Sequence, residues 1–250
     1  MENLKTINNS VSASSRFLGR TYGWMAFALL ISSVVAYFTS LFMFVPTSDG
    51  RLALSTFGAL LFGNRGMGFI ILSILEIVVV IFLSAKIRTI SVGAAVFSFI
   101  FYALLNGLTL SSIFTVYDIA SVANAFLATS LTFFVMSIYG SKTKSNLAKA
   151  GKYLMMGLIG IILASVLHFV IAFFTKAPLK MLDLLISIAT VVIFTGLTAY
   201  DSQKVLAISK SASDSDAYKK IAIIAALELY LDFINILLAL LKLFGRRRND

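Results

Sequence analysis

Four acidic residues fall within or at the edge of long apolar segments of this sequence: Glu76, Asp201, Glu228 and Asp232. No Lys or Arg falls near the middle of such a segment. A charged side chain at the centre of a bilayer costs about 2.5–3.5 kcal/mol on insertion scales, so acids there face protein or water and mark ion or proton paths. An interior lined by acids alone favours cations.

The spacing of these acids places two of them close together. Glu228, Asp232 and Asn235 follow at i, i+4 and i+7, which puts them on one stripe of a helix that must be surrounded by protein. Asp201 and Asp232 lie at similar distances on either side of a Ser/Asp-rich linker, hence at similar depths on consecutive antiparallel helices. Two such carboxylates can share a proton, so we expect the pair to respond to pH.

The composition excludes most enzyme chemistry. The 250 residues include no Cys and a single His, His168, which argues against thiol nucleophiles, thiolate metal sites and His-based triads. With 59% hydrophobic and 13% charged residues, against about 25% charged in soluble domains, this is not a soluble globular protein. We therefore expect a protein that is not an enzyme and needs no cofactor. The net charge is +10, and the Lys and Arg residues that cause it lie between the apolar segments. This placement favours basic loops of a membrane protein over a nucleic-acid-binding surface.

Seven apolar segments are long enough to cross a bilayer as helices. They are residues 22–45, 67–85, 92–117, 121–139, 153–174, 181–200 or somewhat beyond, and 221–244. The sequence predicts an all-α polytopic membrane protein, a seven-transmembrane-helix bundle whose last helix is central. It also predicts three parts: a polar cytoplasmic tail at 1–21, a single seven-helix membrane domain at 22–244, and a basic terminal tail at 245–250.

The distribution of basic residues predicts the orientation. The amino-terminal tail and the second, fourth and sixth loops hold 13 Lys and Arg, whereas the first, third and fifth loops hold 4. Basic loops stay in the cytoplasm, so we expect a cytoplasmic amino terminus. The 4 remaining basic residues are Lys242 and Arg246–Arg248 at the carboxyl-terminal end. The side of this end stays open: the last segment either crosses fully, which we favour, or returns to the cytoplasmic side.

Four short motifs in chain order carry a resemblance to a known family. They are Ser-Ile-Leu-Glu at 73–76, Asn-Gly-Leu-Thr-Leu at 106–110, Ala-Tyr-Asp at 199–201 and, most specific, Leu-Tyr-Leu-Asp-Phe-Ile-Asn at 229–235. Together they resemble the bacterial branch of the Bax inhibitor-1 family, also called the transmembrane Bax inhibitor motif family. The resemblance covers essentially all seven spans.

This resemblance implies a function and a site. It implies a pH-sensitive calcium leak channel of the bacterial inner membrane, gated by an aspartate pair that corresponds to Asp201 and Asp232. Family members tend to carry an Arg that latches onto the pair; the matching position is Ile87, and its neighbours Lys86 and Arg88 are the candidates here. Long basic side chains can reach inward from either position.

Two further acids and one asparagine complete the expected ion pathway. We assign Glu76, Glu228 and Asn235 to it, with calcium as the permeant ion. Calcium prefers six to eight oxygens, so Asp201 and Asp232 would form a weak, transient calcium site rather than a closed cage. Purely structural roles are the alternatives: Asp201 could form an interfacial ion pair with Lys204 at i+3, and Glu76 could form a fixed interhelical hydrogen bond.

Two other functions remain open from the sequence. Some bacterial relatives are associated with a membrane-bound ATP-dependent protease, so the chain could be a regulator of such a partner in the lipid bilayer. The chief enzymatic rival is an intramembrane aspartyl protease, which also needs two aspartates on adjacent helices. Its Gly-x-Gly-Asp and Pro-Ala-Leu motifs are absent, and Asp232 instead follows Leu-Tyr-Leu.

Overall fold

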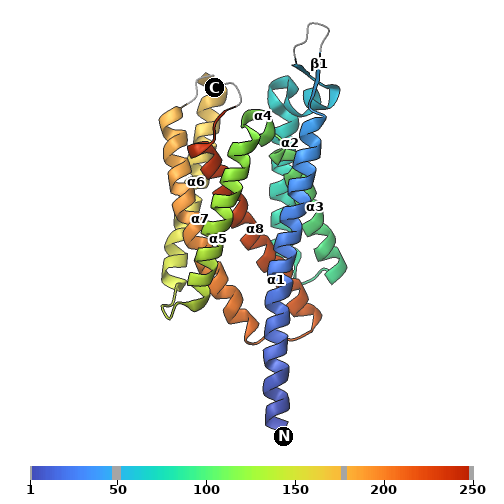
Figure 1. Cartoon of the computed structure of the whole chain (residues 1–250), viewed down its shortest axis with the longest axis vertical. Coiled ribbons are helices and arrows are strands. Elements are labelled where there is room, and N and C mark those ends of the chain that lie inside the picture. The colour runs from blue at the N-terminus through green and yellow to red at the C-terminus, as the bar shows by residue number, and fades with distance from the viewer. Residues whose placement is uncertain (1, 47–51, 176–178, 248–250) are drawn as a thin grey trace. The chain divides into compact units, whose positions relative to one another are not determined.

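The computed structural model describes residues 2–46, 52–175 and 179–247. Within these residues seven helices are long and apolar enough to cross a membrane (Figure 1). The prediction of an all-α polytopic membrane protein is therefore confirmed. The elements are α1 (Glu2–Leu41), β1 (Phe44–Pro46), β2 (Leu52–Leu54), α2 (Thr56–Lys86), α3 (Val92–Leu110), α4 (Ile113–Val116), α5 (Ile119–Lys142), α6 (Ala148–Thr175), α7 (Lys180–Ser209) and α8 (Asp216–Phe244).

Most helices extend beyond the apolar segments from which they were predicted. Polar residues continue a helix into the interfacial region, where hydropathy no longer reveals it. Thus α1 includes most of the predicted polar tail at 1–21, and α7 runs past residue 200 to Ser209. The first loop contains a two-stranded antiparallel sheet, which pairs Phe44 with Leu54. Residues 248–250 of the predicted terminal tail lie outside the described part of the chain.

Local sequence explains where several helices begin. Ser55, Ser91 and Asp118 are the N-caps of α2, α3 and α5, and each side chain accepts a hydrogen bond from a backbone N–H in the first turn. Such caps satisfy donors that a helix cannot pair internally, and each is typically worth about 1 kcal/mol. The starts of these helices are therefore determined by single residues.

A sharp change of direction within α2 depends on glycine. Gly66 has φ +74°, a backbone conformation that side chains with a Cβ rarely adopt. Just beyond it, a Cβ on Gly68 would collide with the backbone of Leu60 and Leu61, eight and seven residues earlier. The first ten residues of α2 therefore fold back on the rest, and the membrane-crossing part begins at Gly66.

The helices fall into two compact units, and the first consists of Met1–Ser14, Asp118–Ala212 and Glu228–Asp250. In this unit α5 and α6 both pack against α7. Its apolar core joins Phe194 and Leu197 of α7 to Ile236 of α8. The backbones of α5 and α7 approach closely here: a Cβ on Gly140 of α5 would collide with the carbonyl of Ala199 on α7.

Polar contacts establish which helix ends of the first unit lie together. Lys242 near the end of α8 pairs with Asp183 at the start of α7, with Nζ 3.1 Å from Oδ1. The backbone N–H of Arg246 donates to Ser121 Oγ at the start of α5. Helix α8 therefore runs antiparallel to α7 as far as the first turn of α7, which supports the full crossing that we favoured.

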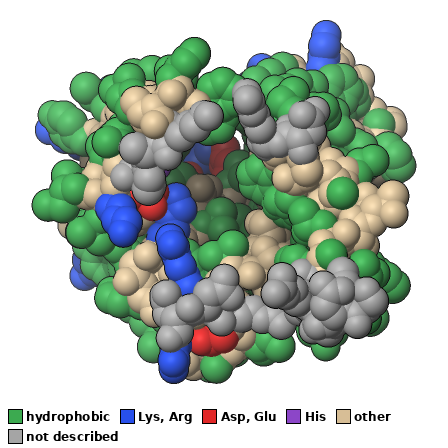
Figure 2. Space-filling view, turned by 90° about the horizontal axis from the view of Figure 1, so that it is seen from above, with side chains coloured by type: hydrophobic (Ala, Val, Ile, Leu, Met, Phe, Trp, Pro, Cys, Tyr) green, Lys and Arg blue, Asp and Glu red, His purple; other side chains and the backbone are tan. Residues whose placement is uncertain are grey.

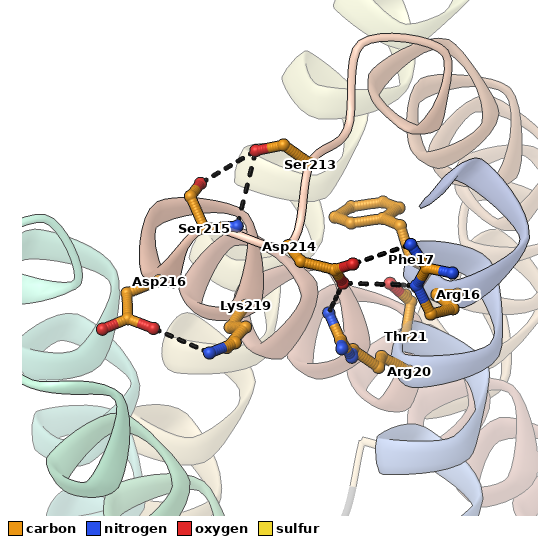
Figure 3. A network of polar contacts seen from close by, with 9 residues as sticks. All are labelled: Arg16, Phe17, Arg20, Thr21, Ser213, Asp214, Ser215, Asp216 and Lys219. Atoms are coloured by element: carbon orange, nitrogen blue, oxygen red, sulfur yellow. Dashed lines mark hydrogen bonds and ion pairs between the residues drawn. The ribbon is translucent and has the colours of Figure 1, made fainter. Parts of the chain in front are cut away.

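The second unit consists of Ser15–Tyr117 and Ser213–Leu227. In it α2 packs against α3, and ion pairs bind the chain before α8 to α1. Figure 3 shows Arg16 and Arg20 of α1 directed at Asp214, with charged-atom distances of 2.7 and 3.1 Å. The hydrogen bond from Arg16 is the largest cause that holds the pKa of Asp214 below its usual value.

Burial separates α8 from the other membrane-crossing helices. In its most apolar 18-residue window 67% of the residues are buried, compared with 44% for α3 and none for α6. A helix this buried is surrounded by protein, as its polar stripe predicted. Large hydrophobic side chains are instead exposed on the outer helices. In the end-on view of Figure 2, hydrophobic side chains make up much of the rim. A surface this apolar suits lipid rather than water.

Candidate functional site

The two aspartates singled out from the sequence belong to the first compact unit and lie on neighbouring helices. Asp201 is on α7 and Asp232 on α8, and their side chains are buried, with residue exposures of 8% and 3%. They are close enough to interact electrostatically. Helix α7 brings Asp201 into the unit because its apolar residues Phe194 and Leu197 pack against Ile236 of α8.

A polar stripe on α7 leads to this pair. Thr195, Thr198 and Asp201 follow at intervals of three residues, so they lie along one face of the helix. Thr198 is fully buried, and its hydroxyl donates to the carbonyl of Phe194 one turn earlier at 2.8 Å. The Oγ1 atom of Thr195 is buried and, within the described chain, lacks a hydrogen-bond partner. Sequence reasoning did not single out Thr195, although its spacing from Asp201 could have indicated it.

One carboxylate oxygen of the pair is left without a bond. Asp232 Oδ2 is buried and finds no hydrogen-bond partner among the residues that the structure describes. An orphaned buried acceptor is unfavourable by about 1–3 kcal/mol, more when charged, so native structures rarely leave one without reason. This oxygen can accept a proton or a cation.

A third acid and a base adjoin the aspartates. Lys204 of α7 donates to both carboxylate oxygens of Glu228 of α8, with Nζ–O distances of 2.9 and 2.8 Å. Glu228 and Lys204 both interact electrostatically with Asp201 and with Asp232. The expected i+3 partner of Asp201 is therefore shared with an acid on the neighbouring helix. Sequence analysis did not foresee this interhelical ion pair. We call Asp201, Lys204, Glu228 and Asp232 the charged cluster.

Neighbouring side chains of α5 fix the position of the charged cluster. Phe233, next to Asp232, packs edge-to-face against Phe126 and Phe133, with ring centroids 5.4 and 5.8 Å away. Ser202, next to Asp201, donates to Ser137 of α5 at 2.9 Å. Aromatic pairs of this geometry and interhelical hydrogen bonds each contribute about 0.5–1.5 kcal/mol. Each aspartate is thus held in place because the next residue in the chain, Ser202 or Phe233, contacts α5.

The other predicted pathway residues are held by partners of their own. Glu76 of α2 accepts hydrogen bonds from Thr109 at 2.7 Å and Asn106 at 3.2 Å, both on α3 and all in the second unit. Asn235 of α8 donates to the carbonyl of Leu231 one turn earlier in its own helix. The structure thus shows for Glu76 the fixed interhelical hydrogen bonds that were its alternative reading.

The candidate latch residues lie at the end of α2, in the second unit. Lys86 is in the last turn of the helix and Arg88 in the turn that follows, and both are exposed. The Lys220 ammonium donates to the carbonyls of Arg88 and Ile90, at 2.9 and 3.0 Å, which ties this turn to the start of α8. Their action on the aspartate pair stays a prediction.

The donor set of the charged cluster fits an exchangeable cation better than a resident metal. Across the described ranges no three His, Asp or Glu side chains converge closely enough to hold a metal ion. Calcium would need several further oxygens from water or backbone. Carboxylates in a water-poor interior attract cations strongly because the dielectric constant is low. The cluster can therefore exchange protons and weakly bound cations.

Sequence comparisons identify relatives along the whole chain. A family model described as "Inhibitor of apoptosis-promoting Bax1" matches residues 14–249. An uncharacterized protein of Borreliella burgdorferi is 40% identical over 251 residues, covering 100% of both chains. Inner membrane protein YbhL of Escherichia coli K12 is 40% identical over 93% of this chain and 92% of its own. An uncharacterized membrane protein of Streptococcus pyogenes serotype M3 is 32% identical over 93% of each chain. With its seven apolar helices, this integral membrane protein belongs to the Bax inhibitor-1 family.

Proposed function

We propose that the protein is a pH-sensitive leak channel for cations, with calcium as the permeant ion and Asp201 and Asp232 as the gate. The observation that carries the proposal is the buried and unbonded oxygen of Asp232, which has Asp201 and Glu228 as charged neighbours. A buried acceptor among three carboxylates attracts cations, and protons compete for the same oxygens. The polar stripe of Thr195 and Thr198 supplies further oxygens along α7.

Protons act on this gate by changing the charge of the pair. In the closed state, a base from the Lys86–Arg88 turn holds the ionised aspartates, and proton uptake removes that attraction. Acid therefore favours opening, although protons also displace calcium from the carboxylates. We expect the loss of the latch to dominate, because an ion pair in a water-poor interior is stronger than a weak calcium site.

The test is calcium flux into liposomes that contain the purified protein and a calcium dye. We expect flux to rise as the pH falls from about 8 to 5.5, and Asp232→Asn to change the flux and flatten this profile. Asp216→Asn is the matched control, since it removes one charge from an exposed acid. A wild type without calcium flux would refute the leak, and a flat wild-type profile would refute the shared proton.

The latch has its own test. Replacing both Lys86 and Arg88 by Ala should raise the flux at neutral pH and weaken its pH response, because the ionised pair then has no base to hold it closed. An unchanged pH profile in this double variant would eliminate the latch and leave the aspartate gate standing.

The alternative functions make different predictions in the same preparation. A protein that acts solely as a regulator of a membrane-bound ATP-dependent protease would be captured with that protease and would conduct no calcium. An intramembrane aspartyl protease would cleave a helical substrate, and Asp201→Asn and Asp232→Asn would each abolish cleavage. Flux without cleavage selects the leak channel.

We also propose that the amino terminus faces the cytoplasm of a bacterial cell, with the protein in the inner membrane. The α5–α6 loop and the end of α7 lie together, since Gln203 bonds both Ser145 and Leu147 of that loop. Both regions are rich in Lys and would be cytoplasmic. In Ser145→Cys and Thr56→Cys variants of intact cells, an impermeant thiol reagent should label Cys at 56 alone; labelling at 145 alone would invert the orientation.

A further inference from the structure

The Lys204–Glu228 ion pair lies at one end of the aspartate pair. Lys204 follows Asp201 by three residues toward the end of α7, and Glu228 precedes Asp232 by four residues near the start of α8. At about 1.5 Å per residue, both charges lie about one helical turn closer to the α7–α8 linker than the aspartates do. The ion pair thus stands between the aspartates and that linker.

The charges of the cluster do not balance. Three carboxylates, those of Asp201, Glu228 and Asp232, share the single ammonium of Lys204. That ammonium donates to both oxygens of Glu228, whereas Asp232 Oδ2 is buried and unbonded in the part of the chain that the structure describes. The cluster therefore contains its own cation but has an acceptor left for another.

We propose that the ammonium of Lys204 is a tethered counter-cation of the charged cluster, held by Glu228, that limits how tightly a free divalent cation binds at Asp201 and Asp232. This inference rests on the proposed leak function and deepens it by naming a residue that sets cation affinity. Lys204 is a positioning residue, because it acts through the carboxylates and not by binding the ion.

The physical basis is competition between like charges. A divalent cation at the buried aspartates is repelled by the nearby ammonium and attracted by each carboxylate. Water screens part of the effect of Lys204 and Glu228, because their side chains are 39% and 35% exposed. Removing the ammonium should therefore tighten binding, and removing the Glu228 charge should weaken it. Removing both leaves the net charge of the cluster unchanged, so binding should return close to its original strength.

Three variants separate this charge effect from a structural one. We would measure equilibrium binding of radioactive calcium to purified protein for Lys204→Gln, Glu228→Gln and the double variant. The expected affinities are about tenfold higher, about tenfold lower and close to wild type, respectively. If the ion pair served merely to hold α7 against α8, all three variants would bind calcium equally poorly.

Two controls keep the result specific. Lys210→Gln removes the same charge from an exposed position just beyond α7 and should leave calcium affinity unchanged. Lys204→Arg keeps the cation and should also bind as the wild type does. An affinity of Lys204→Gln equal to or below that of the wild type, including no detectable binding, would overturn the inference.

Flux distinguishes this inference from the leak function. Tighter binding slows the release of a permeant ion, so calcium flux through Lys204→Gln should saturate at a calcium concentration about tenfold lower than in the wild type. If no variant conducts but the order of affinities holds, the leak function fails and the tethered cation stands. If the wild type conducts but Lys204→Gln saturates at the same concentration, the tethered cation fails alone.

Discussion

Glu76 and Asp232 are both acids within membrane-crossing helices, yet their surroundings differ. The carboxylate of Glu76 has a neutral hydrogen-bond donor on each oxygen, Thr109 and Asn106 of the adjacent helix. The carboxylate of Asp232 shares its environment with two other acids, and one of its oxygens has no bond among the described residues. An acid whose hydrogen bonds are complete stabilises helix packing, whereas a buried acid with an unbonded oxygen is the better candidate for a functional role.

The largest effect is expected when the carboxylate of Asp232 is removed. Asp232→Leu should change calcium flux by about tenfold or more and flatten its pH profile, because the unbonded carboxylate oxygen and the shared proton are lost. Thermal stability in detergent should stay level or rise, because apolar residues often stabilise sites of buried charge. Flux assays and thermal unfolding of the same sample measure both. Wild-type flux in this variant would show that the unbonded oxygen has no role in conduction.

The next effect concerns the packing that holds Asp201 in place. Gly140→Leu should lower the free energy of unfolding by about 1–3 kcal/mol or prevent folding, because a side chain there collides with the Ala199 backbone on α7. Gly160→Leu is the matched control, since a Cβ at Gly160 meets no atom within 4 Å. Equal melting temperatures for the two variants would contradict the close approach of α5 and α7.

Glu76→Leu tests whether Glu76 serves helix packing and not conduction. It should lower the free energy of unfolding by about 1–2 kcal/mol, because two interhelical hydrogen bonds are lost and their donors stay buried. Glu76→Gln keeps an acceptor and should lose less. Calcium flux per folded molecule and its pH profile should be retained in both variants; a change in flux and pH profile as large as that of Asp232→Leu would instead return Glu76 to the ion pathway.

The smallest effect concerns an acid outside the membrane. The pKa of Asp214 is held below its usual value, chiefly by the hydrogen bond from Arg16. A group with a lowered folded-state pKa contributes stability above its unfolded pKa and loses it as the pH falls through the folded value. Asp214→Asn should therefore lower the melting temperature slightly at neutral pH. The difference should disappear as the pH falls through the folded-state pKa of Asp214, which lies below the usual value. A difference independent of pH would rule out the ion pairs as its source.

Much of the architecture follows from local sequence properties. Hydropathy determined seven crossing helices, because each span must bury its backbone bonds within itself and present apolar side chains to lipid. The spacing of Glu228, Asp232 and Asn235 indicated a helix surrounded by protein, and α8 is the most buried of the seven. The family also followed from the sequence, since its specific motif lies within that helix.

Tertiary structure alone decided how each acid is used. Asn106 and Thr109 could be recognised as polar residues of a helix, but their bonds to Glu76 depend on how α2 and α3 are rotated against each other. The sequence offered Asp201, three residues earlier, as the partner of Lys204. In the structure Lys204 donates to Glu228, because α8 places this second acid beside Lys204. Helical periodicity specifies which face a residue occupies, whereas the partner across an interface depends on the packing of two helices, which no single segment encodes.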